Sequence, residues 1–182
     1  TCALPILKKY GGDLAIGAFG IVNRLVFIVV MIVMGLNQGM QPIAGYNFGA
    51  KLYGRVNKVL RLTIIYATAV TTFGFLVGML VPDLVVGIFT SDAELTELSV
   101  TGLRITVMFF PIIGFQMVTS NFFQSIGMAG KAIFLSLTRQ MLILLPCLLV
   151  LPQFFGVAGV WYSMPVSDLL ASLIALVMLV CQ

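Results

Sequence analysis

The chain has 182 residues, of which 60% are hydrophobic and only 9% are charged, and its formal net charge is +4. A soluble domain normally carries about a quarter charged residues, so this composition excludes an ordinary water-soluble domain and predicts a membrane protein. The chain has no histidine, and its three cysteines show no CxxC spacing. The sequence therefore predicts no metal site and no cofactor, and its basic residues indicate membrane topology rather than nucleic-acid binding.

Five apolar stretches are long enough to cross a bilayer, which takes about 20 helical residues. Long runs without strand-like alternation predict helices rather than a barrel. We therefore expect an all-α membrane protein with about five transmembrane helices. The predicted spans are approximately 14–50, 62–80, 100–123, 132–151 and 157–180. Residues 1–10 are expected to be the tail of a preceding helix with an outer loop, and residues 11–182 one helix bundle, so the chain is interpreted as a fragment of a longer protein.

The first span ends in an unusually polar and glycine-rich segment, residues 35–61. Its two pairs of glycines, each four residues apart, predict close helix packing. These are Gly35 with Gly39 and Gly45 with Gly49. Pro42 removes a backbone donor and predicts a kink. Gln38 and Gln41 are candidate residues of a substrate pathway.

The predicted loops give the chain an orientation. Residues 51–61 carry four basic side chains and residues 124–131 carry Lys131, whereas residues 81–98 carry only acidic ones. The positive-inside rule therefore predicts that loops 51–61 and 124–131 are cytoplasmic and that the protein is a multi-pass protein of the inner (plasma) membrane. Lys8 and Lys9 fall on the opposite side and disagree with this assignment. In the outer segment, Ser91-Asp92-Ala93-Glu94 fits a helix N-cap with an acidic first turn, which predicts a short surface helix before the third span.

Four charged residues fall at membrane depth: Arg24, Arg104, Arg139 and Asp168. Such residues usually pair, face a bundle interior or line an aqueous route. Asp168 therefore has two interpretations, a proton- or cation-binding carboxylate, or a fixed ion pair with Arg139 or Arg24. For Arg139, snorkelling to the cytoplasmic surface is an alternative. Helical spacing places Trp161 on the same face of the last span as Asp168, together with Pro165 and Ser172.

The third span carries a polar stripe. Gln116, Ser120 and Gln124 are spaced by four residues, and Asn121 lies beside them. The stripe is compatible with interhelical hydrogen bonds or with the lining of a substrate pathway. Prolines within four of the five spans predict a bundle that bends, as transporters do. They are Pro42, Pro111, Pro146 and Pro165.

These segments together resemble a known family. GxxQGMQPIAGYNFGAK followed by a basic segment is similar to the signature of the multidrug and toxic compound extrusion (MATE) family. Further matches are PIIGFQMVTSNFFQSIGMAGKA and SLTRQMLILLPCLLVLPQFFGVAGVWYSMPVSD. The resemblance covers essentially the whole chain. It implies a transporter of twelve helices in two lobes, in which this chain is the C-terminal lobe and the N-terminal lobe is its partner.

The resemblance also implies a function, the secondary active efflux of cationic, lipophilic or amphipathic drugs in exchange for sodium ions or protons, by alternating access within membrane lipid. Family members often carry coupling acids in the first helix of the N-terminal lobe, and some carry them in helices seven and ten. Residues 100–123, which correspond to helix ten, contain no acid. We therefore expect ion coupling mainly in the other lobe, with Asp168 as a local candidate.

Two alternatives stay open at the level of sequence. A flippase for lipid-linked precursors or polysaccharides of the same superfamily is compatible with Arg24, Arg104 and Arg139. An integral-membrane enzyme is a remote alternative, because the chain has no histidine and no paired carboxylates. The protein is therefore not expected to be an enzyme.

Overall fold

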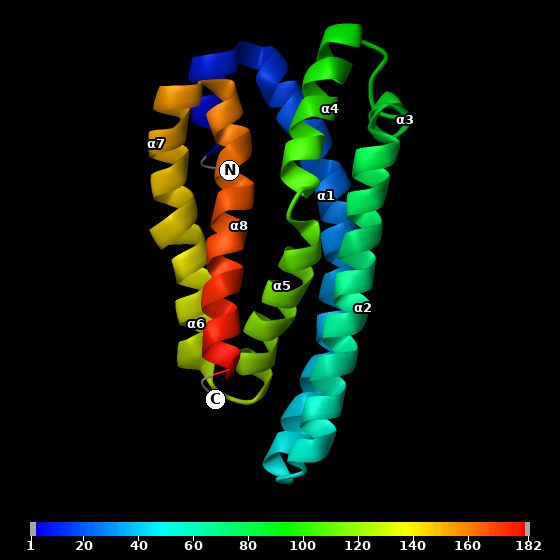
Figure 1. The fold of residues 1–182 in the computed structure, drawn as a ribbon, viewed down its shortest axis with the longest axis vertical. Helices are drawn as coiled ribbons and strands as arrows, with labels where there is room; N and C mark the ends of the chain where they lie inside the picture. Colours follow the sequence, from blue (N-terminus) through cyan, green and yellow to red (C-terminus); the bar gives the residue numbers. More distant parts are fainter. Residues whose placement is uncertain (1–2, 181–182) are drawn as a thin grey trace.

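The structure is a computed structural model that describes residues 3–180, with the backbone alone for residues 3–11. Residues 1–2, part of the predicted tail segment 1–10, lie outside the described residues, as do residues 181–182. The described chain folds into long helices that run side by side (Figure 1). The helices are α1 (Ala3–Gly49), α2 (Tyr53–Leu80), α3 (Pro82–Gly87), α4 (Ala93–Val107), α5 (Phe110–Ser125), α6 (Ala129–Leu137), the π-helix η1 (Thr138–Leu144), α7 (Leu145–Phe155) and α8 (Val157–Val180).

Four helical segments are long and apolar enough to cross a membrane, and the bent pair of α4 and α5 supplies a fifth. The four are Gly12–Gly49, Tyr53–Leu80, Ala129–Phe155 and Val157–Val180. The prediction of an all-α membrane protein with about five spans is confirmed. Many large apolar side chains face outward, among them Phe27, Phe73 and Phe154, as expected where lipid rather than water surrounds the helices.

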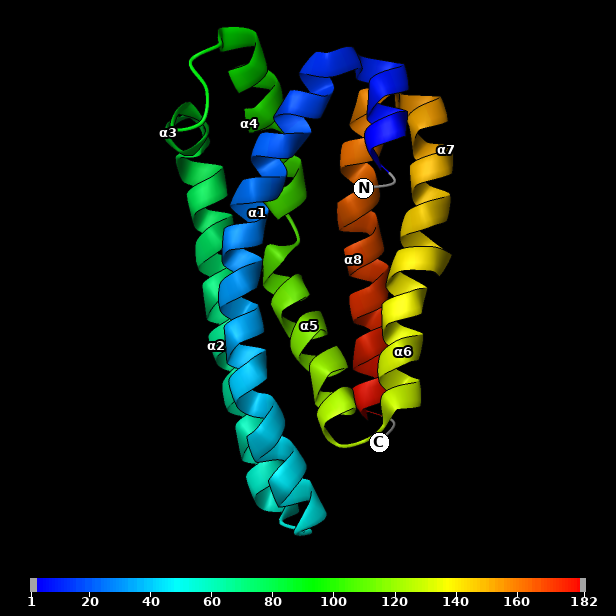
Figure 2. The ribbon, with the colours of Figure 1, turned by 180° about the vertical axis from the view of Figure 1, so that it is seen from behind.

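The first helix breaks at Gly12 rather than at the predicted kink residue Pro42. Gly12 has φ 63° and ψ −159°, a conformation that glycine adopts readily because it lacks a Cβ atom. Pro42 lies inside α1, and Gly12 is the residue at which the dihedral angles of α1 leave the helical range. The segment before Gly12 lies against the end of the bundle where α7 meets α8 (Figure 2).

The prediction that residues 51–61 form a loop is wrong, because most of this segment is helical. Only residues 50–52 separate α1 from α2, and Lys51 has a positive φ of 58° in this tight connection. Arg55, Lys58 and Arg61 lie in the first turns of α2. Arginine, lysine and leucine are good helix formers, so the helix continues into the basic segment although it is too polar for the hydrocarbon. The hairpin of α1 and α2 consequently extends past the α5–α6 turn (Figures 1 and 2).

Two of the four prolines coincide with irregular backbone. Pro111 lies in the first turn of α5, directly after the break that bends α4 and α5 by 54°. Pro146 lies in the first turn of α7, directly after the π-helix η1. A proline ring clashes with the carbonyl four residues earlier, so a break or a wider turn before it relieves the clash. The predicted continuous spans 100–123 and 132–151 are therefore segmented, whereas α8 continues through Pro165.

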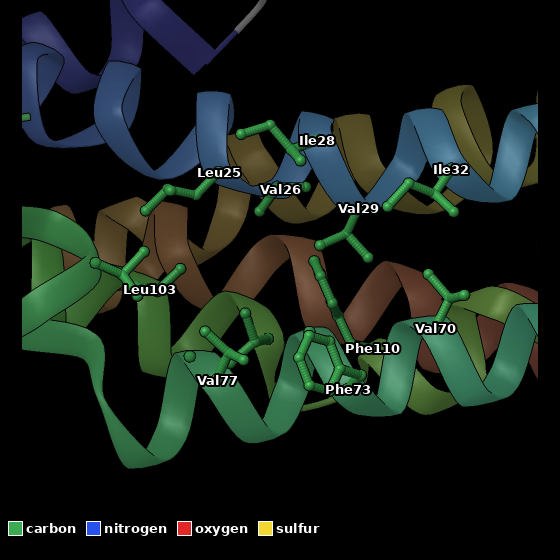
Figure 3. Close-up of a pocket in the computed structure, with 14 residues that line it drawn as sticks. Leu25, Val26, Ile28, Val29, Ile32, Val70, Phe73, Val77, Leu103 and Phe110 are labelled. Carbon is green, nitrogen blue, oxygen red and sulfur yellow. The ribbon is translucent and has the colours of Figure 1, made fainter. Parts of the chain in front are cut away.

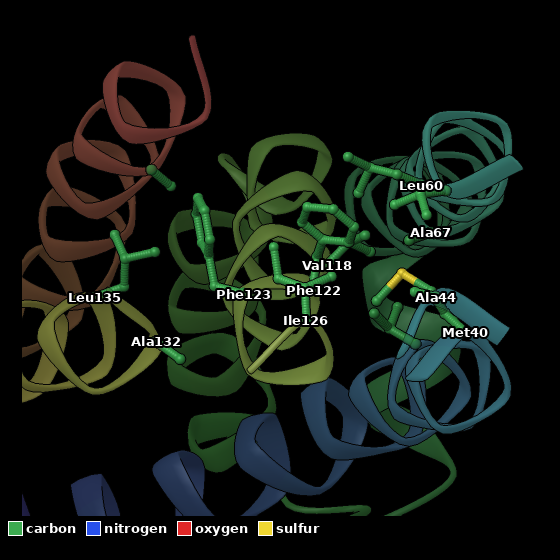
Figure 4. Packing of buried hydrophobic residues seen from close by; sticks show 13 residues of the cluster. Met40, Ala44, Leu60, Ala67, Val118, Phe122, Phe123, Ile126, Ala132 and Leu135 are labelled. Atoms are coloured by element: carbon green, nitrogen blue, oxygen red, sulfur yellow. The ribbon is translucent and has the colours of Figure 1, made fainter. Parts of the chain in front are cut away.

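Helix α5 packs against α1, α2, α6 and α8. Its buried residues Val118 and Phe123 belong to a cluster that includes Met40 of α1, Leu60 of α2 and Leu135 of α6 (Figure 4). A second cluster, nearer the α3–α4 end, surrounds the buried Trp161 of α8. Buried polar side chains also occur in the bundle, on α1, α2, α4, α5, η1 and α8.

Candidate functional site

An ion pair joins the helical segments η1 and α8. Arg139 Nη2 lies 2.7 Å from Asp168 Oδ1, and the side chain of Asp168 is 8% exposed whereas that of Arg139 is 34% exposed. No other ion pair forms among the side chains that the structure describes. Of the two partners predicted for Asp168, the structure selects Arg139. The carboxylate is therefore charge-balanced, and a cation that binds there has to compete with the guanidinium.

The π-helix determines where Arg139 points. In η1 the backbone N–H of Leu145 donates to the carbonyl of Gln140, five residues back, instead of four. The wider turn rotates the residues that precede it relative to a regular α-helix. Arg139 is the second residue of η1, so the placement of its guanidinium against α8 depends on this turn and on Pro146 after it. Such π-turns are frequent at functional sites.

Arg24 and Arg104 have no carboxylate partner within the described part of the chain. Both side chains are exposed on the surface of the bundle. Arg24 lies deeper in its predicted span than Arg139, which makes snorkelling harder and favours an ion pair or a backbone-carbonyl partner, but no such partner is found among the described residues. Arg24 therefore presents an uncompensated positive charge on the outer surface of α1.

One predicted pair of pathway residues forms a link between helices. Gln41 Nε2 donates to Asn121 Oδ1 at 3.1 Å, which connects α1 to α5. Asn121 Nδ2 in turn donates to the carbonyl of Met117 at 2.9 Å. Gln38, one turn before Gln41, has an exposed side chain. Of the two glutamines in the glycine-rich segment, Gln41 is engaged in packing and Gln38 is free to contact another surface.

The residues of the predicted polar stripe in the third span have different environments in the structure. Gln116 is 4% exposed, and its Oε1 has no hydrogen-bond partner among the described residues. Ser120 and Gln124 line a cavity of about 300 Å³ between α5 and α6. Asn121 faces α1 through its bond to Gln41. A spacing of four residues advances by 400° around an α-helix, so successive members rotate by about 40° and leave a common face.

Trp161 is a packing residue in this structure. It is 2% exposed, and its ring lies 5.7 Å from that of Phe19 in α1. A Cβ atom on Gly102 would lie only 2.6 Å from the indole ring, so α4 can approach α8 here only because residue 102 is glycine. The predicted stripe Trp161, Pro165, Asp168 and Ser172 does share the buried face of α8.

The largely apolar groove between α1 and α2 was not predicted from the sequence. It encloses about 240 Å³, and Leu25, Val29, Phe73, Val77, Leu103 and Phe110 contribute to its walls (Figure 3). Its side chains have the same apolar character as those that face lipid, so composition does not reveal it. The one sequence feature that could have indicated the groove is the pair Gly74 and Gly78, which contribute to its lining. Cβ atoms there would lie 3.0 Å from Val29 and 3.1 Å from Val107, respectively.

The described residues contain no cluster of histidine, cysteine or acidic side chains that could hold a metal ion. The arrangement offers instead one internal ion pair, polar helix contacts, an apolar groove and unpaired arginines.

Known proteins resemble this chain in both sequence and fold. The family model MatE matches residues 5–149. The multidrug export protein MepA of Staphylococcus aureus (strain MSSA476) is 27% identical over 173 residues, which cover 95% of this chain and 38% of MepA. The chain therefore spans less than half the length of this curated relative.

Solved structures give the same result. The MATE multidrug transporter DinF-BH, solved with a bound compound, is 38% identical with a TM-score of 0.85, over 97% of this chain and 40% of its own. The bent form of the Vibrio cholerae MATE transporter VcmN has a TM-score of 0.87 at 21% identity, over 96% of this chain and 40% of its own, and shows the likeness in fold alone. The predicted assignment to one lobe of such a transporter is confirmed.

Proposed function

This chain belongs to the MATE family of membrane transporters, and from that premise we propose that it forms the C-terminal lobe of a multidrug exporter. The observation that carries the proposal is the match to DinF-BH over 97% of this chain. Because the chain spans 40% of that transporter, we propose that an N-terminal lobe completes the substrate pathway.

The proposed substrates are cationic, amphipathic or lipophilic compounds. The curated relative MepA is a multidrug export protein, and DinF-BH is a multidrug transporter. In this lobe the exposed Gln38 and the groove between α1 and α2 supply polar and apolar surfaces for such compounds. An exchange for sodium ions or protons drives the export in this proposal.

The coupling ion is proposed to bind mainly outside this chain. Asp168 is the one acidic residue within the described spans 129–155 and 157–180, and Arg139 already balances its charge. Residues 100–123, which correspond to the helix in which some family members carry an acid, have none. Within this lobe, the break at Gly12 and the 54° bend between α4 and α5 provide hinge points for alternating access.

The alternatives rank lower. A flippase of the same superfamily is not favoured, because the curated relatives of this chain in Staphylococcus aureus and Staphylococcus saprophyticus are multidrug exporters. An integral-membrane enzyme belongs to a different class from the transporter family that the chain matches. We further propose that the protein lies in the inner (plasma) membrane with the Lys51 and Lys131 side facing the cytoplasm.

The test is the accumulation of ethidium in cells that express the full-length gene product. Export lowers the steady-state fluorescence of the dye relative to cells with an empty vector. Collapse of the membrane ion gradients should restore accumulation. Unchanged accumulation, with the protein shown to be in the membrane, would contradict the proposed function.

A further inference from the structure

We propose that the outward face of the beginning of α2 binds the headgroup of an anionic phospholipid, with Lys58 and Arg61 as the phosphate-contacting residues. This inference goes beyond drug export, since it concerns a lipid site on the membrane-facing surface. It does not depend on drug export, because it requires only that this face of α2 meets lipid in the assembled protein.

The proposed site is a pocket on one side of a single helix. It encloses about 390 Å³, and it is called the basic pocket here; its lining residues are Gly54, Asn57, Lys58, Arg61, Leu62 and Ile65. At 100° per residue, these positions lie on the face of α2 opposite its buried residues Val56, Leu60 and Thr63. The basic pocket therefore opens away from the other described helices of the bundle.

The depth of the basic pocket matches a membrane surface. Gly45 of α1 packs so closely on the end of α5 that an added Cβ atom would lie 2.9 Å from the carbonyl oxygen of Ser125. Asn57 of α2 shares a cavity of about 440 Å³ with Ile126 of the α5–α6 turn. Lys58 therefore lies near the level of this turn, at which the neighbouring predicted spans end, while the tip of the α1–α2 hairpin extends further (Figure 1).

Aromatic residues mark the same level. Tyr46 is 79% exposed and Tyr53 is 54% exposed, and both flank the α1–α2 connection. Tyrosine is enriched at membrane–water interfaces, where its ring contacts the acyl region and its hydroxyl contacts headgroups. The beginning of α2 thus has the composition of an interfacial segment.

The charge of the segment is not balanced within the chain. Lys51, Arg55, Lys58 and Arg61 are all exposed, and no acidic residue occurs between Asp13 and Asp83 in the sequence. None of the four forms an ion pair with a described residue. Guanidinium and ammonium groups bind phosphate oxygens strongly, and basic clusters next to a transmembrane helix attract anionic lipids.

The apolar wall of the basic pocket favours a lipid over a water-soluble acidic partner. Leu62 is 42% exposed and Ile65 is 56% exposed, and they follow Arg61 along the same face towards the bilayer. A phospholipid can place its phosphate between Lys58 and Arg61 and its acyl chain along these two residues. A soluble acidic protein would leave this apolar wall uncovered.

The test uses the full-length gene product, purified in detergent and titrated with phosphatidylglycerol or phosphatidylcholine while bound lipids are counted by native mass spectrometry. We expect phosphatidylglycerol to bind preferentially, and the double variant K58Q/R61Q to weaken that binding about tenfold, since each basic residue near the surface contributes to the attraction. The exchange K58R/R61K, which keeps both charges, should keep the preference.

A matched control removes the same number of charges elsewhere. The variant R104Q/K131Q removes the positive charges of Arg104 in α4 and of Lys131. Lys131 Nζ lies 5.3 Å from the centroid of the Phe123 ring. This variant should bind phosphatidylglycerol within about twofold of the parent, because neither residue lines the basic pocket. The single variants K58Q and R61Q replace the double variant if its melting temperature shows that it is unfolded.

Three results would overturn the proposal. They are equal binding of the two lipids, an unchanged preference in K58Q/R61Q, and an equal loss in R104Q/K131Q. The last result would show that net charge alone attracts the lipid, without a site on α2.

Discussion

At the scale of single residues, the pair Arg139 and Asp168 carries the clearest electrostatic argument. A lone charge at membrane depth costs about 2.5–3.5 kcal/mol on insertion scales. Two opposite charges 2.7 Å apart offset much of that cost for each other. The pair therefore explains how both residues are tolerated between apolar helices.

Removal of one partner should destabilise the protein more than removal of both. D168N leaves the guanidinium of Arg139 unpaired, and we expect a loss of about 1–3 kcal/mol. This is below the cost for a fully buried pair because Arg139 is one-third exposed. The double variant R139Q/D168N should melt closer to the parent than either single variant, R139Q or D168N, because it leaves no unpaired charge. Melting temperatures of the purified full-length protein measure this coupling.

A different role for Asp168 would give a different result. If the carboxylate carried the coupling ion, D168N would abolish transport while the melting temperature stayed unchanged. Additive losses in R139Q/D168N would show that the two residues do not stabilise each other, and would contradict the ion-pair account.

At the scale of elements, Asp92 defines the beginning of α4. Its Oδ1 accepts hydrogen bonds from the backbone N–H groups of Glu94 at 3.0 Å and Leu95 at 3.4 Å. The sequence predicted an N-cap within residues 91–94 that opens a short surface helix; the structure confirms the cap, at Asp92, but not the separate surface helix. The cap belongs to the bent span itself, because α4 continues from Ala93 into the membrane part of the chain.

Loss of this cap should loosen the first turn of α4. We expect D92A to cost about 1 kcal/mol, because two N–H groups lose their acceptor, and to accelerate amide hydrogen exchange at residues 94–96 about fivefold. D92S should keep most of the protection, and S91A, which removes no bond to α4, is the matched control. Equal exchange in D92A and the parent would show that the cap does not stabilise the helix.

The sequence predicted elements better than it predicted their interruptions. Hydropathy and length are strong signals for membrane helices, so α8 was predicted as 157–180, the range that the structure gives. The backbone breaks were harder, because a proline such as Pro165 or Pro42 can lie in a continuous helix. The extension of α2 into the basic segment was missed because charge was read as a loop signal.

The predictions for the candidate site residues were correct within one helix and incomplete between helices. Sequence spacing correctly grouped Trp161 and Asp168 on the buried face of α8. It could not show that Gln41 bonds Asn121, or that Arg139 rather than Arg24 pairs with Asp168, because those contacts depend on how helices pack. The groove between α1 and α2 has no polar signature and was not predicted.

At the scale of the whole molecule, the two ends of the bundle differ in charge. The α1–α2 connection and α6 carry basic residues, whereas α3 and the beginning of α4 carry Asp83, Asp92 and Glu94 (Figure 1). These ends lie at opposite sides of the bundle. The positive-inside rule therefore gives the whole lobe one expected orientation.

This orientation can be tested with single cysteines. In a variant with Cys2, Cys147 and Cys181 replaced by serine, we expect E94C to react with a membrane-impermeant maleimide in intact cells. R55C should react only after the membrane is permeabilised, because its end of α2 faces the cytoplasm. Labelling of R55C in intact cells, with E94C protected, would reverse the proposed topology.

The most direct test of the central claim is dye transport by the purified full-length gene product in proteoliposomes of defined lipid. An imposed gradient of sodium ions or of protons should drive ethidium across the membrane against its own gradient, and dissipation of that gradient with an ionophore should stop the movement. No ethidium movement under either gradient, with folded and correctly inserted protein, would contradict the assignment of this chain to an ion-coupled multidrug exporter.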